Sequence, residues 1–374
     1  MIDNKNFLNA LQTRNIRFFA GVPDSLLKDF CAYLTDHAEP SAHVITANEG
    51  AAVGLGMGHH FATGGVPLIY MQNSGLGNAI NPLLSLADPE VYATPMLLLV
   101  GWRGEPGVKD EPQHVKQGRV MLAMLSAMDI PFAVIGPDDD SADPALDRAM
   151  EHFKTKSGPF VLAVQKGTFQ TYKLSDSSAP EYAMTREEAI GELLDPMSPA
   201  DVVVSTTGMA SRELFELRVK RGEGHERDFL TVGGMGHASQ IALGIAQQVP
   251  DRKVFCIDGD GAALMHLGSF PITGISACAN FRHVLINNGA HDSVGGQPTV
   301  GFDIDYGAIA TASGYQIILR ADSKEELAAK MKEFISAPGP SLLEIRVRKG
   351  ARKDLGRPTK TPIENKQALM QFLS

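Results

Sequence analysis

The sequence predicts an α/β protein made of two doubly wound parallel-sheet domains of similar topology. Short apolar runs recur at intervals that suit βα units, six in each half of the chain. A weak internal repeat supports duplication, because the same residue types end an amphipathic helix and enter an apolar strand in both halves. The repeated residues are Met150, Phe153, Gly158 and Pro159, then Met331, Phe334, Gly339 and Pro340.

The first domain is predicted to cover residues 1–170. Its candidate strands are apolar runs bounded by turn-forming or polar residues, as expected of buried parallel strands. They lie near Ile16–Ala20, His43–Ala47, Val66–Met71, Met96–Val100, Phe132–Ile135 and Phe160–Val164. Residues 171–184 follow, and their content of serine, aspartate and proline predicts a surface linker.

The second domain is predicted to cover residues 185–374. Thr185 and Glu188 have the spacing of a capping box, so we expect a helix to begin just after Thr185. The candidate strands lie near Val202–Ser205, Phe229–Val232, Val254–Asp258, His283–Asn287, Tyr315–Leu319 and Leu342–Val347. A basic, proline-containing tail at about residues 350–362 precedes a short amphipathic helix.

The composition argues against nucleic-acid and membrane partners. The chain has 374 residues, of which 44% are hydrophobic, and a net charge of −9. With no basic stretch to offset it, this charge argues against nucleic-acid binding. The amino terminus lacks an apolar signal segment and no apolar run is long enough to span a membrane, so we expect a cytoplasmic protein.

Two strand ends in the second half carry the most informative motif. Asp260 follows an apolar run and lies between Gly259 and Gly261, and Asn287-Asn288 follow the next such run. Because the carboxyl ends of neighbouring parallel strands meet at one sheet edge, a carboxylate and a carboxamide are expected to lie together. Hard oxygen ligands suit Mg²⁺, and glycines let backbone N–H groups approach phosphate oxygens. The pattern predicts a site for a diphosphate held through a divalent metal.

A glycine-rich turn follows the short strand near residues 229–232. Gly234 and its neighbours would allow a ligand to approach the backbone closely, although a tight strand-to-helix turn uses the same residues. Gly234, Gly236 and Ser239 almost form a dinucleotide fingerprint, but Ser239 replaces the last glycine and no acidic residue follows at the usual distance. A nicotinamide site is therefore the weaker alternative.

Polar groups also gather at strand ends in the first half. Glu49 opens a helix rich in small residues, where it is either a proton-transfer group with a raised pKa or an ordinary helix-terminal charge. Ser74 lies in a polar segment after the third strand that supplies amide and hydroxyl partners. A long loop after the fourth strand carries Arg103, Lys109 and His114, and such loops are commonly functional.

With these motifs in view, the chain resembles the thiamine diphosphate-dependent 2-oxo acid decarboxylases. The resemblance rests on Glu49, Met235, Asp260 and Asn288 and on the strings Gly21–Leu27, Arg103–Gly107, Glu111–His114 and His291–Thr299. It covers two catalytic domains, a pyrimidine-binding domain followed by a diphosphate-binding domain. It implies the thiamine diphosphate-binding fold without the family's usual middle domain.

The resemblance implies thiamine diphosphate and Mg²⁺ as cofactors. The metal ligands would be the Asp260 and Asn288 side chains and the Ala290 carbonyl group. Met235 would keep the cofactor bent, and Glu49 would face its pyrimidine ring. Further cofactor contacts are expected from Ser74, Thr207, Gly208, Gly234, Gly261 and Ala262.

The same resemblance assigns acid–base roles. Glu49 would exchange a proton with the pyrimidine ring, and Asp24, His114 or His291 would protonate the carbon that loses CO₂. The family's glutamate, usually found six residues after the second asparagine, is replaced by Val294. This replacement increases the weight on the three candidate proton donors.

The implied reaction is the decarboxylation of a 2-oxo acid that bears a phosphonate, with a sulfonate-bearing acid as the nearest rival. A phosphonate carries about two negative charges and needs cationic or hydrogen-bonding partners. The candidates are Ser25, Lys28, Arg103 and Lys109. The family's architecture implies a homo-oligomer, at least a dimer, with active sites shared between subunits. The alternative from a different class is a non-catalytic or nicotinamide-binding doubly wound protein.

Overall fold

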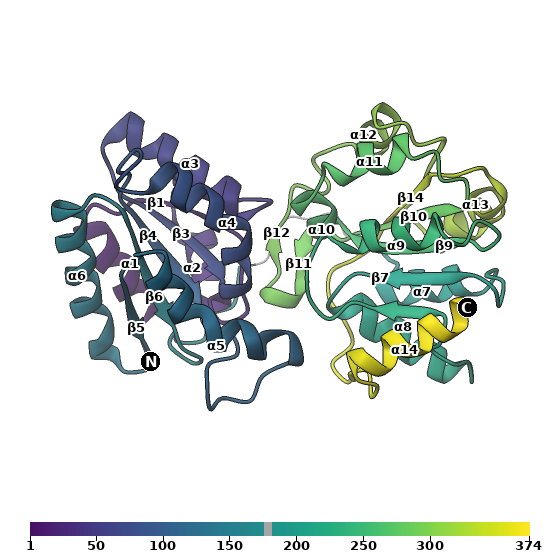
Figure 1. The fold of residues 1–374 in the computed structure, drawn as a ribbon, viewed down its shortest axis with the longest axis horizontal. Helices are drawn as coiled ribbons and strands as arrows, with labels where there is room; N and C mark the ends of the chain where they lie inside the picture. Colours follow the sequence, from purple (N-terminus) through teal and green to yellow (C-terminus); the bar gives the residue numbers. More distant parts are fainter. Residues whose placement is uncertain (176–181) are drawn as a thin grey trace. The chain divides into compact units, whose positions relative to one another are not determined.

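The structure, a computed structural model, describes residues 1–175 and 182–374 (Figure 1). The chain divides into two compact units, Met1–Ser177 with His291–Pro298, and Ser178–Ala290 with Thr299–Ser374. The segment His291–Pro298 thus groups with the first unit, whereas the predicted boundaries put it in the second domain. Part of the predicted linker, residues 176–181, lies outside the described residues.

The first unit is built on a six-stranded parallel sheet with the order β2-β1-β3-β4-β6-β5. Its strands are β1 (Phe18–Gly21), β2 (His43–Ile45), β3 (Pro67–Gln72), β4 (Met96–Gly101), β5 (Phe132–Ile135) and β6 (Pro159–Val164). Each predicted strand of this half forms, and no bound shifts by more than two residues. The apolar runs predict these strands well because both faces of the sheet are buried.

Helices cover both faces of this sheet (Figure 1). Alternate residues of a strand point to opposite faces, so Leu97 and Leu99 of β4 join one core, and Leu98 and Val100 join the other. The first core is closed by α1 (Asn4–Thr13), α2 (Lys28–His37) and α6 (Ala142–Thr155). The second is closed by α3 (Glu49–Thr63), α4 (Leu76–Pro82) and α5 (Pro112–Ala127).

The second unit repeats this topology. Its six-stranded parallel sheet has the order β13-β14-β10-β9-β7-β8, which, read from β8, follows the connectivity of the first sheet. The strands are β7 (Val202–Ser205), β8 (Asp228–Leu230), β9 (Val254–Gly259), β10 (Phe281–Asn287), β13 (Ile317–Ala321) and β14 (Ser341–Arg346). The predicted similarity of the two domains is therefore confirmed, and again no strand bound shifts by more than two residues.

Helices also cover both faces of the second sheet. One core contains α7 (Arg186–Leu194), α8 (Met209–Lys220) and α13 (Lys324–Ser336). The opposite face carries α9 (Ala238–Ala246), α10 (Asp260–Met265), α11 (Ser269–Ile275), α12 (Tyr306–Ala312) and α14 (Pro362–Leu373). A short two-stranded sheet, β11 (Ala290–His291) with β12 (Gln297–Pro298), was not predicted.

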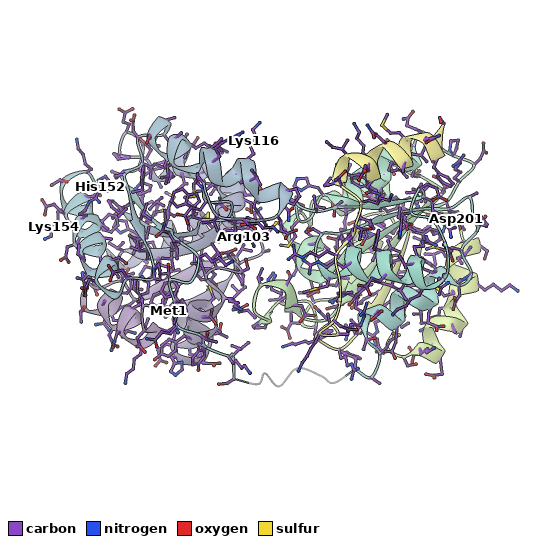
Figure 2. The ribbon with its side chains drawn as sticks, turned by 90° about the horizontal axis from the view of Figure 1, so that it is seen from below. Met1, Arg103, Lys116, His152, Lys154 and Asp201 are labelled. Carbon is purple, nitrogen blue, oxygen red and sulfur yellow. The ribbon has the colours of Figure 1, made fainter. Side chains whose placement is uncertain are left out.

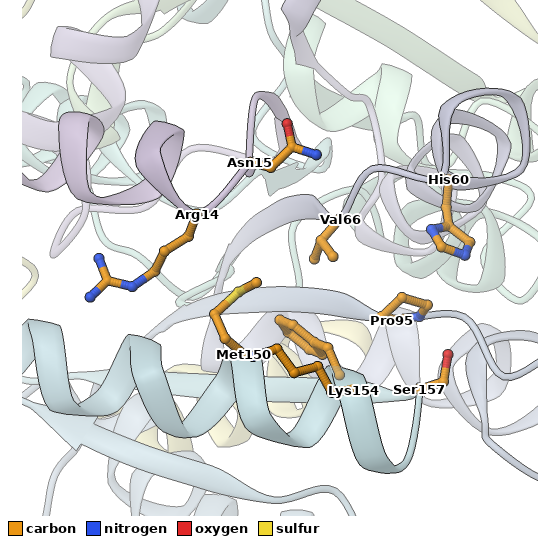
Figure 3. Close-up of a pocket in the computed structure, with 10 residues that line it drawn as sticks. Arg14, Asn15, His60, Val66, Pro95, Met150, Lys154 and Ser157 are labelled. Atoms are coloured by element: carbon orange, nitrogen blue, oxygen red, sulfur yellow. The ribbon is translucent and has the colours of Figure 1, made fainter.

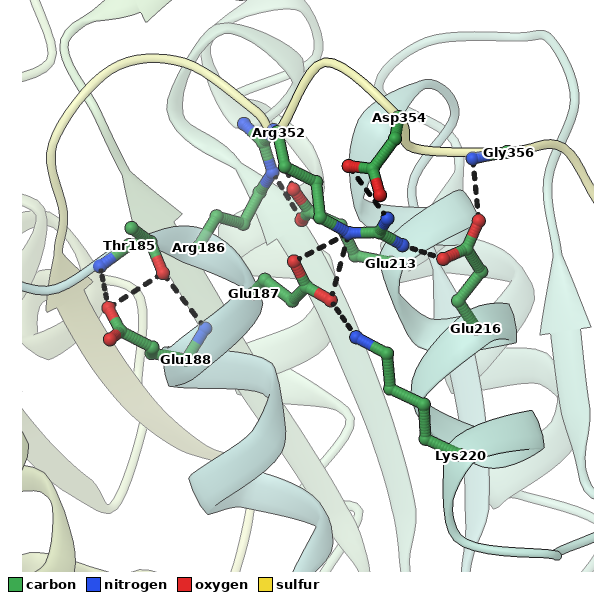
Figure 4. A network of polar contacts seen from close by, with 10 residues as sticks. All are labelled: Thr185, Arg186, Glu187, Glu188, Glu213, Glu216, Lys220, Arg352, Asp354 and Gly356. Atoms are coloured by element: carbon green, nitrogen blue, oxygen red, sulfur yellow. Dashed lines mark hydrogen bonds and ion pairs between the residues drawn. The ribbon is translucent and has the colours of Figure 1, made fainter.

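Polar contacts fix the two ends of the second unit. The predicted capping box at Thr185 and Glu188 is present at the start of α7. In the basic tail, Arg352 donates to Glu187 (Nε to Oε2, 3.0 Å) and pairs with Glu216, so the tail is attached to α7 and α8 (Figure 4). The predicted helix after the tail forms as α14. Across the described part of the chain, helices are too short or too polar to cross a membrane.

Candidate functional site

Asp24 is fully buried where β1, β3 and β4 of the first unit end. Its Oδ1 accepts the Gln72 side-chain amide at 2.5 Å, and its Oδ2 accepts the backbone N–H of Leu26 at 2.8 Å. Burial raises the pKa of Asp24, and these two donors oppose the rise. Gly101 packs so closely that a Cβ atom there would lie 2.1 Å from Oδ2. The carboxyl group is therefore fixed in one orientation.

Arg103 and Ser25, two of the predicted substrate residues, lie together beside Asp24. Arg103 donates from Nη1 to the Ser25 hydroxyl (2.7 Å) and from Nε to Asp110 Oδ2 (2.8 Å), and its Nη2 pairs with the other Asp110 oxygen. Asn73 holds the Arg103 carbonyl group through Nδ2 (2.8 Å). The bond to Asp110 raises the pKa of Arg103. A cation is thus fixed at this sheet edge, with Asp110 as its counter-ion.

Glu49 opens α3 and is only 5% exposed. Its Oε2 accepts the Asn78 side-chain amide at 2.8 Å, and Gly75 packs so tightly that a Cβ atom there would lie 2.3 Å from Oε1. Burial raises the pKa of Glu49, and the bond from Asn78 opposes this effect. The side chain is therefore a buried carboxyl group with a raised pKa, rather than an exposed helix-terminal charge.

The remaining predicted residues of the first half lie in several settings. Lys28, at the start of α2, and Lys109, in the long loop, are exposed. His114 lies in the first turn of α5, where burial and then the charge of Arg103 lower its pKa to about 4. His291 ends β11, and burial lowers its pKa to about 4. Both histidines are therefore neutral at pH 7.

In the second unit, the three predicted metal ligands lie together. Asp260 starts α10 directly after β9, and its Oδ1 faces the backbone N–H of Asn288 at 3.5 Å. The Asn288 Oδ1 atom in turn accepts the backbone N–H of Ala290 at 3.1 Å. Burial raises the pKa of Asp260 to about 6. The donor set consists of hard oxygen atoms, which fits Mg²⁺.

Several neighbours of Asp260 were missed because no sequence pattern marks them as its partners. The Thr299 hydroxyl donates to Asp260 Oδ2, and the Tyr306 hydroxyl donates to the Asp260 carbonyl at 3.0 Å. Gly301 packs so tightly that a Cβ atom there would lie 2.6 Å from Oδ2. The Asn287 side-chain amide donates to the carbonyl oxygen of Gly301 at 2.6 Å. The first asparagine of the pair thus fixes the wall beside Asp260.

The predicted glycine turn packs against the start of α10. Gly234 and Gly236 have φ angles of 68° and 83°, which favour glycine. A Cβ atom on Gly236 would lie 2.9 Å from the Ala262 carbonyl oxygen. Met235 is half-buried between the two glycines. Gly208, after β7, has a φ angle of 96° and precedes α8. These residues therefore lie at the same sheet edge as Asp260.

A buried polar cluster lies on one face of β9 and β10, two residues before Asp260. It contains Cys256, Asp258 and His283, whose potential metal-ligating atoms lie within 4.8 Å of one another. His283 Nε2 lies 3.5 Å from Asp258 Oδ2, and its Nδ1 meets the Tyr315 hydroxyl at 3.0 Å. The Tyr315 hydroxyl thus partners Nδ1 of His283, whereas Nε2 has only the 3.5 Å contact with Asp258 and no hydrogen bond among the described residues.

A cavity of about 370 Å³ lies at the other edge of the first sheet (Figure 3). Asn15, Val66 and Pro95 line it, and they precede β1, β3 and β4 rather than follow them. Figure 2 shows Lys154, which also lines this cavity, and Arg103 on opposite sides of the first unit. Since ligands of open parallel sheets bind at the carboxyl ends of the strands, this cavity is separate from the candidate site.

Comparison with known proteins identifies the class to which this fold and these residues belong. Residues 4–128 match the family model "Thiamine pyrophosphate enzyme, N-terminal TPP binding domain". Residues 207–345 match the model "Thiamine pyrophosphate enzyme, C-terminal TPP binding domain". The chain belongs to the thiamine pyrophosphate enzyme family, and thiamine diphosphate is its cofactor. The predicted fold class and family resemblance are confirmed.

Within this family the chain is similar to particular decarboxylases. It is 34% identical to the phosphonopyruvate decarboxylase of Streptomyces hygroscopicus, over all of this chain and 94% of that protein. It is 32% identical to the enzyme of the same name from Streptomyces viridochromogenes, over all of this chain and 96% of that protein. The sulfopyruvate decarboxylase of Methanosarcina acetivorans is 26% identical, over 92% of this chain and 90% of that protein.

Proposed function

We propose that the protein is a carboxy-lyase that converts 3-phosphonopyruvate into phosphonoacetaldehyde and CO₂, a step of phosphonate biosynthesis. The observation that carries this proposal is the 34% identity over the whole chain to a phosphonopyruvate decarboxylase. The lower identity to a sulfopyruvate decarboxylase makes sulfopyruvate the second candidate substrate. Family membership argues against the nicotinamide-binding alternative. A cytoplasmic location stays a prediction.

Mg²⁺ is the proposed second cofactor. Asp260, Asn288 and the Ala290 carbonyl group would hold it, and the cofactor's diphosphate would complete its shell. The contacts of Asp260 with Asn288 and Thr299 support this role because they keep the carboxylate in place before a metal arrives. The glycine turn with Met235 packs against α10 and would contact the organic part of the cofactor.

Glu49 is the proposed partner of the cofactor's pyrimidine ring. Bound thiamine diphosphate supplies a thiazolium ring that accepts the electron pair released when CO₂ leaves. Glu49 would hold a proton against a ring nitrogen, a task that suits a buried carboxyl group with a raised pKa. Asn78 and Gly75 fix its two oxygen atoms, so the proton position is defined.

Asp24 is the proposed proton donor late in the reaction. It is buried, its pKa is raised, and it lies at the edge where Arg103 and Ser25 also lie. His114 and His291 are the other candidates, although burial lowers the pKa of both and they are neutral at pH 7. A raised pKa favours the protonated carboxyl group that such a donor needs, which supports Asp24 over the two neutral histidines.

The phosphonate is proposed to bind near Arg103. The guanidinium group is fixed by Asp110 and donates to Ser25, which supports a place for an anion at this edge. Lys28 and Lys109 are exposed and would add charge. The excess positive charge of this group would favour a dianionic phosphonate over a monoanionic sulfonate.

The direct test is to incubate the purified protein with Mg²⁺, thiamine diphosphate and each 2-oxo acid and to measure CO₂ release. We expect release from phosphonopyruvate, with kcat/KM at least about tenfold above that for sulfopyruvate, or about 1.4 kcal/mol of discrimination. A preference for sulfopyruvate would select the second candidate. CO₂ release from neither acid would overturn the proposal. The variant Asp260→Ala should lose Mg²⁺-dependent cofactor retention, whereas the exposed Asp251→Ala should keep it.

A further inference from the structure

Three polar side chains of the first unit form a continuous hydrogen-bonded chain. The Ser74 hydroxyl donates to Gln72 Oε1 at 2.7 Å, and Gln72 Nε2 donates to Asp24 Oδ1 at 2.5 Å. Ser74 is exposed, Gln72 is half-buried at the end of β3, and Asp24 is fully buried. These hydrogen bonds therefore connect the buried Asp24 carboxyl group to the surface through the Gln72 amide.

The sheet places Gln72 beside Asp24, where its side-chain amide donates to Oδ1. β1 pairs with β3 and β3 pairs with β4, with Gln72 opposite Gly101. Gly101 packs against Oδ2, and the Leu26 amide donates to the same oxygen. Gln72 is the closer of two side-chain donors to Oδ1, at 2.5 Å, because the Ser25 hydroxyl, which accepts from Arg103, donates to the same atom at 3.4 Å.

Two segments place charged or titratable side chains next to Asp24. On the loop after β4, Arg103 faces it, with Asp110 as the counter-ion of Arg103. On α2, the Cys31 thiol faces it, and burial holds the pKa of that thiol well above its usual range, so it is neutral. Among the influences that favour ionised Asp24, the bond from Gln72 is the largest, followed by the Leu26 amide and then Arg103.

We propose that Gln72, held by Ser74, is a positioning residue for Asp24: it fixes the carboxyl group and stabilises its ionised form. The inference rests on the proposed function, in which Asp24 is the late proton donor. In that step the O–H bond of Asp24 breaks and its electron pair stays on the carboxylate, while a C–H bond forms from the electron pair that the departure of CO₂ left behind. Asp24 then takes back a proton from water.

A glutamine suits this position because it donates without titrating. A histidine or lysine there would add its own protonation equilibrium to that of Asp24. Asp24 selects the amide orientation, since a flipped Gln72 would place Oε1 against its oxygen atom, and the Ser74 hydroxyl then holds Oε1 by donating to it. Ser74→Ala should therefore weaken the effect of Gln72 without removing it.

The test follows the protonation of Asp24 itself. In the holoenzyme, the infrared band of the Asp24 carboxyl group is identified by its absence from Asp24→Asn. The pH dependence of this band is then measured in the wild type, Gln72→Leu and Ser74→Ala. Without the donor the ionised form is less stable, so the midpoint should rise by about one pH unit in Gln72→Leu and by less in Ser74→Ala. Gln72→Asn, which keeps the amide but shortens the side chain, should also raise it and serves if Gln72→Leu does not fold.

Gln165→Leu is the matched control. Gln165 donates its amide to the Glu105 carboxylate in the same unit, so this variant also loses a glutamine–carboxylate bond. Its Asp24 midpoint should equal that of the wild type. In kinetics, Gln72→Leu should lower kcat more than it raises KM, and the limb of the pH profile that belongs to Asp24 should move to higher pH with the infrared midpoint.

The outcomes separate the two proposals. If the wild type releases CO₂ from phosphonopyruvate but the Asp24 midpoint is the same in Gln72→Leu and the wild type, the positioning role is wrong and the function stands. If the wild type releases no CO₂ from this acid, the proposed function fails, and the infrared titration still decides whether Gln72 controls the protonation of Asp24.

Discussion

At the scale of single residues, three carboxyl groups of the candidate site are removed from water, and each has a hydrogen-bond donor. Glu49, Asp24 and Asp260 are at most 5% exposed. Their side-chain donors are Asn78, Gln72 and Thr299. Burial raises the pKa of all three, and the donors keep each carboxyl group in one orientation. Burial combined with a hydrogen-bond donor therefore prepares all three carboxyl groups, the two proposed to hold a proton and the one proposed to bind a metal.

The role of Glu49 can be separated from cofactor binding. Glu49→Gln keeps the size of the side chain and its contact with Asn78 but removes the carboxyl proton. We expect kcat for phosphonopyruvate to fall by about 10²–10⁴-fold, while the Kd for thiamine diphosphate changes little. Calorimetry and steady-state kinetics measure the two quantities, and Glu39→Gln, an exposed change in the same unit, is the control. A normal kcat in Glu49→Gln would remove this role.

His43 makes stability depend on pH. Its Nε2 meets the Tyr70 hydroxyl at 2.9 Å, and burial lowers its pKa to about 4. An unfolded histidine titrates near about 6.5, so between these values the unfolded chain binds more protons and stability rises with pH. The contribution is full above about pH 6.5 and is lost as the pH falls toward 4.

This pH dependence of stability predicts a measurable difference between the wild type and a variant without His43. From pH 7 to pH 4.5, the free energy of unfolding of the wild type should fall by about 2 kcal/mol more than that of His43→Gln. Urea unfolding at several pH values measures the fall. The exposed His37→Gln should behave like the wild type. Parallel curves for the wild type and His43→Gln would show that His43 is not the cause.

At the scale of elements, a buried ion pair joins α8 to β8. Arg218 donates to both oxygen atoms of Asp228 at 2.9 Å, and neither side chain is exposed. Arg218→Met would leave Asp228 buried and unpaired, so the free energy of unfolding should fall by about 3–5 kcal/mol. Urea unfolding measures the loss.

Two further variants make that result specific. Lys220→Met, on the same helix, breaks an exposed pair with Glu187 and should cost less than about 1 kcal/mol. Adding Asp228→Leu to Arg218→Met should recover part of the loss, because no unpaired charge then stays buried. If Arg218→Met costs no more than Lys220→Met, the pair does not stabilise this unit.

The strands and helices also differ in how well the sequence predicts them. Buried parallel strands are apolar on both faces, so their runs stand out, and Asp260 and Asn288 are recognisable because they directly follow such runs. β11 and β12 have two residues each, too few for any periodic pattern. The contact of Asn78 with Glu49 depends on packing between α3 and α4, and local sequence does not encode it.

At the scale of the whole molecule, two units of the same topology carry different functional groups. In the first unit the candidate residues follow β1, β2, β3 and β4, and in the second they follow β7, β8, β9 and β10. Glu49 follows the second strand of its sheet, whereas Asp260 follows the third strand of its own. The shared topology therefore does not put the same functional groups at corresponding strand ends.

This division of groups gives a test of the proposed oligomer. Glu49 belongs to the first unit and Asp260 to the second, and we propose that active sites are shared between the subunits of at least a dimer. Co-expressed Glu49→Gln and Asp260→Ala chains, each inactive alone, would form hybrid dimers. With shared sites, one site of each hybrid carries both changes and the other carries neither.

The mixture should then recover about a quarter of the wild-type activity, since about half of the dimers are hybrids and each has one intact site. Two different affinity tags isolate the hybrid, light scattering gives its mass, and CO₂ release from phosphonopyruvate gives its activity. If each site were built within one chain, every site of a hybrid would carry one of the two changes. A purified hybrid with no more activity than either variant alone would therefore exclude shared sites.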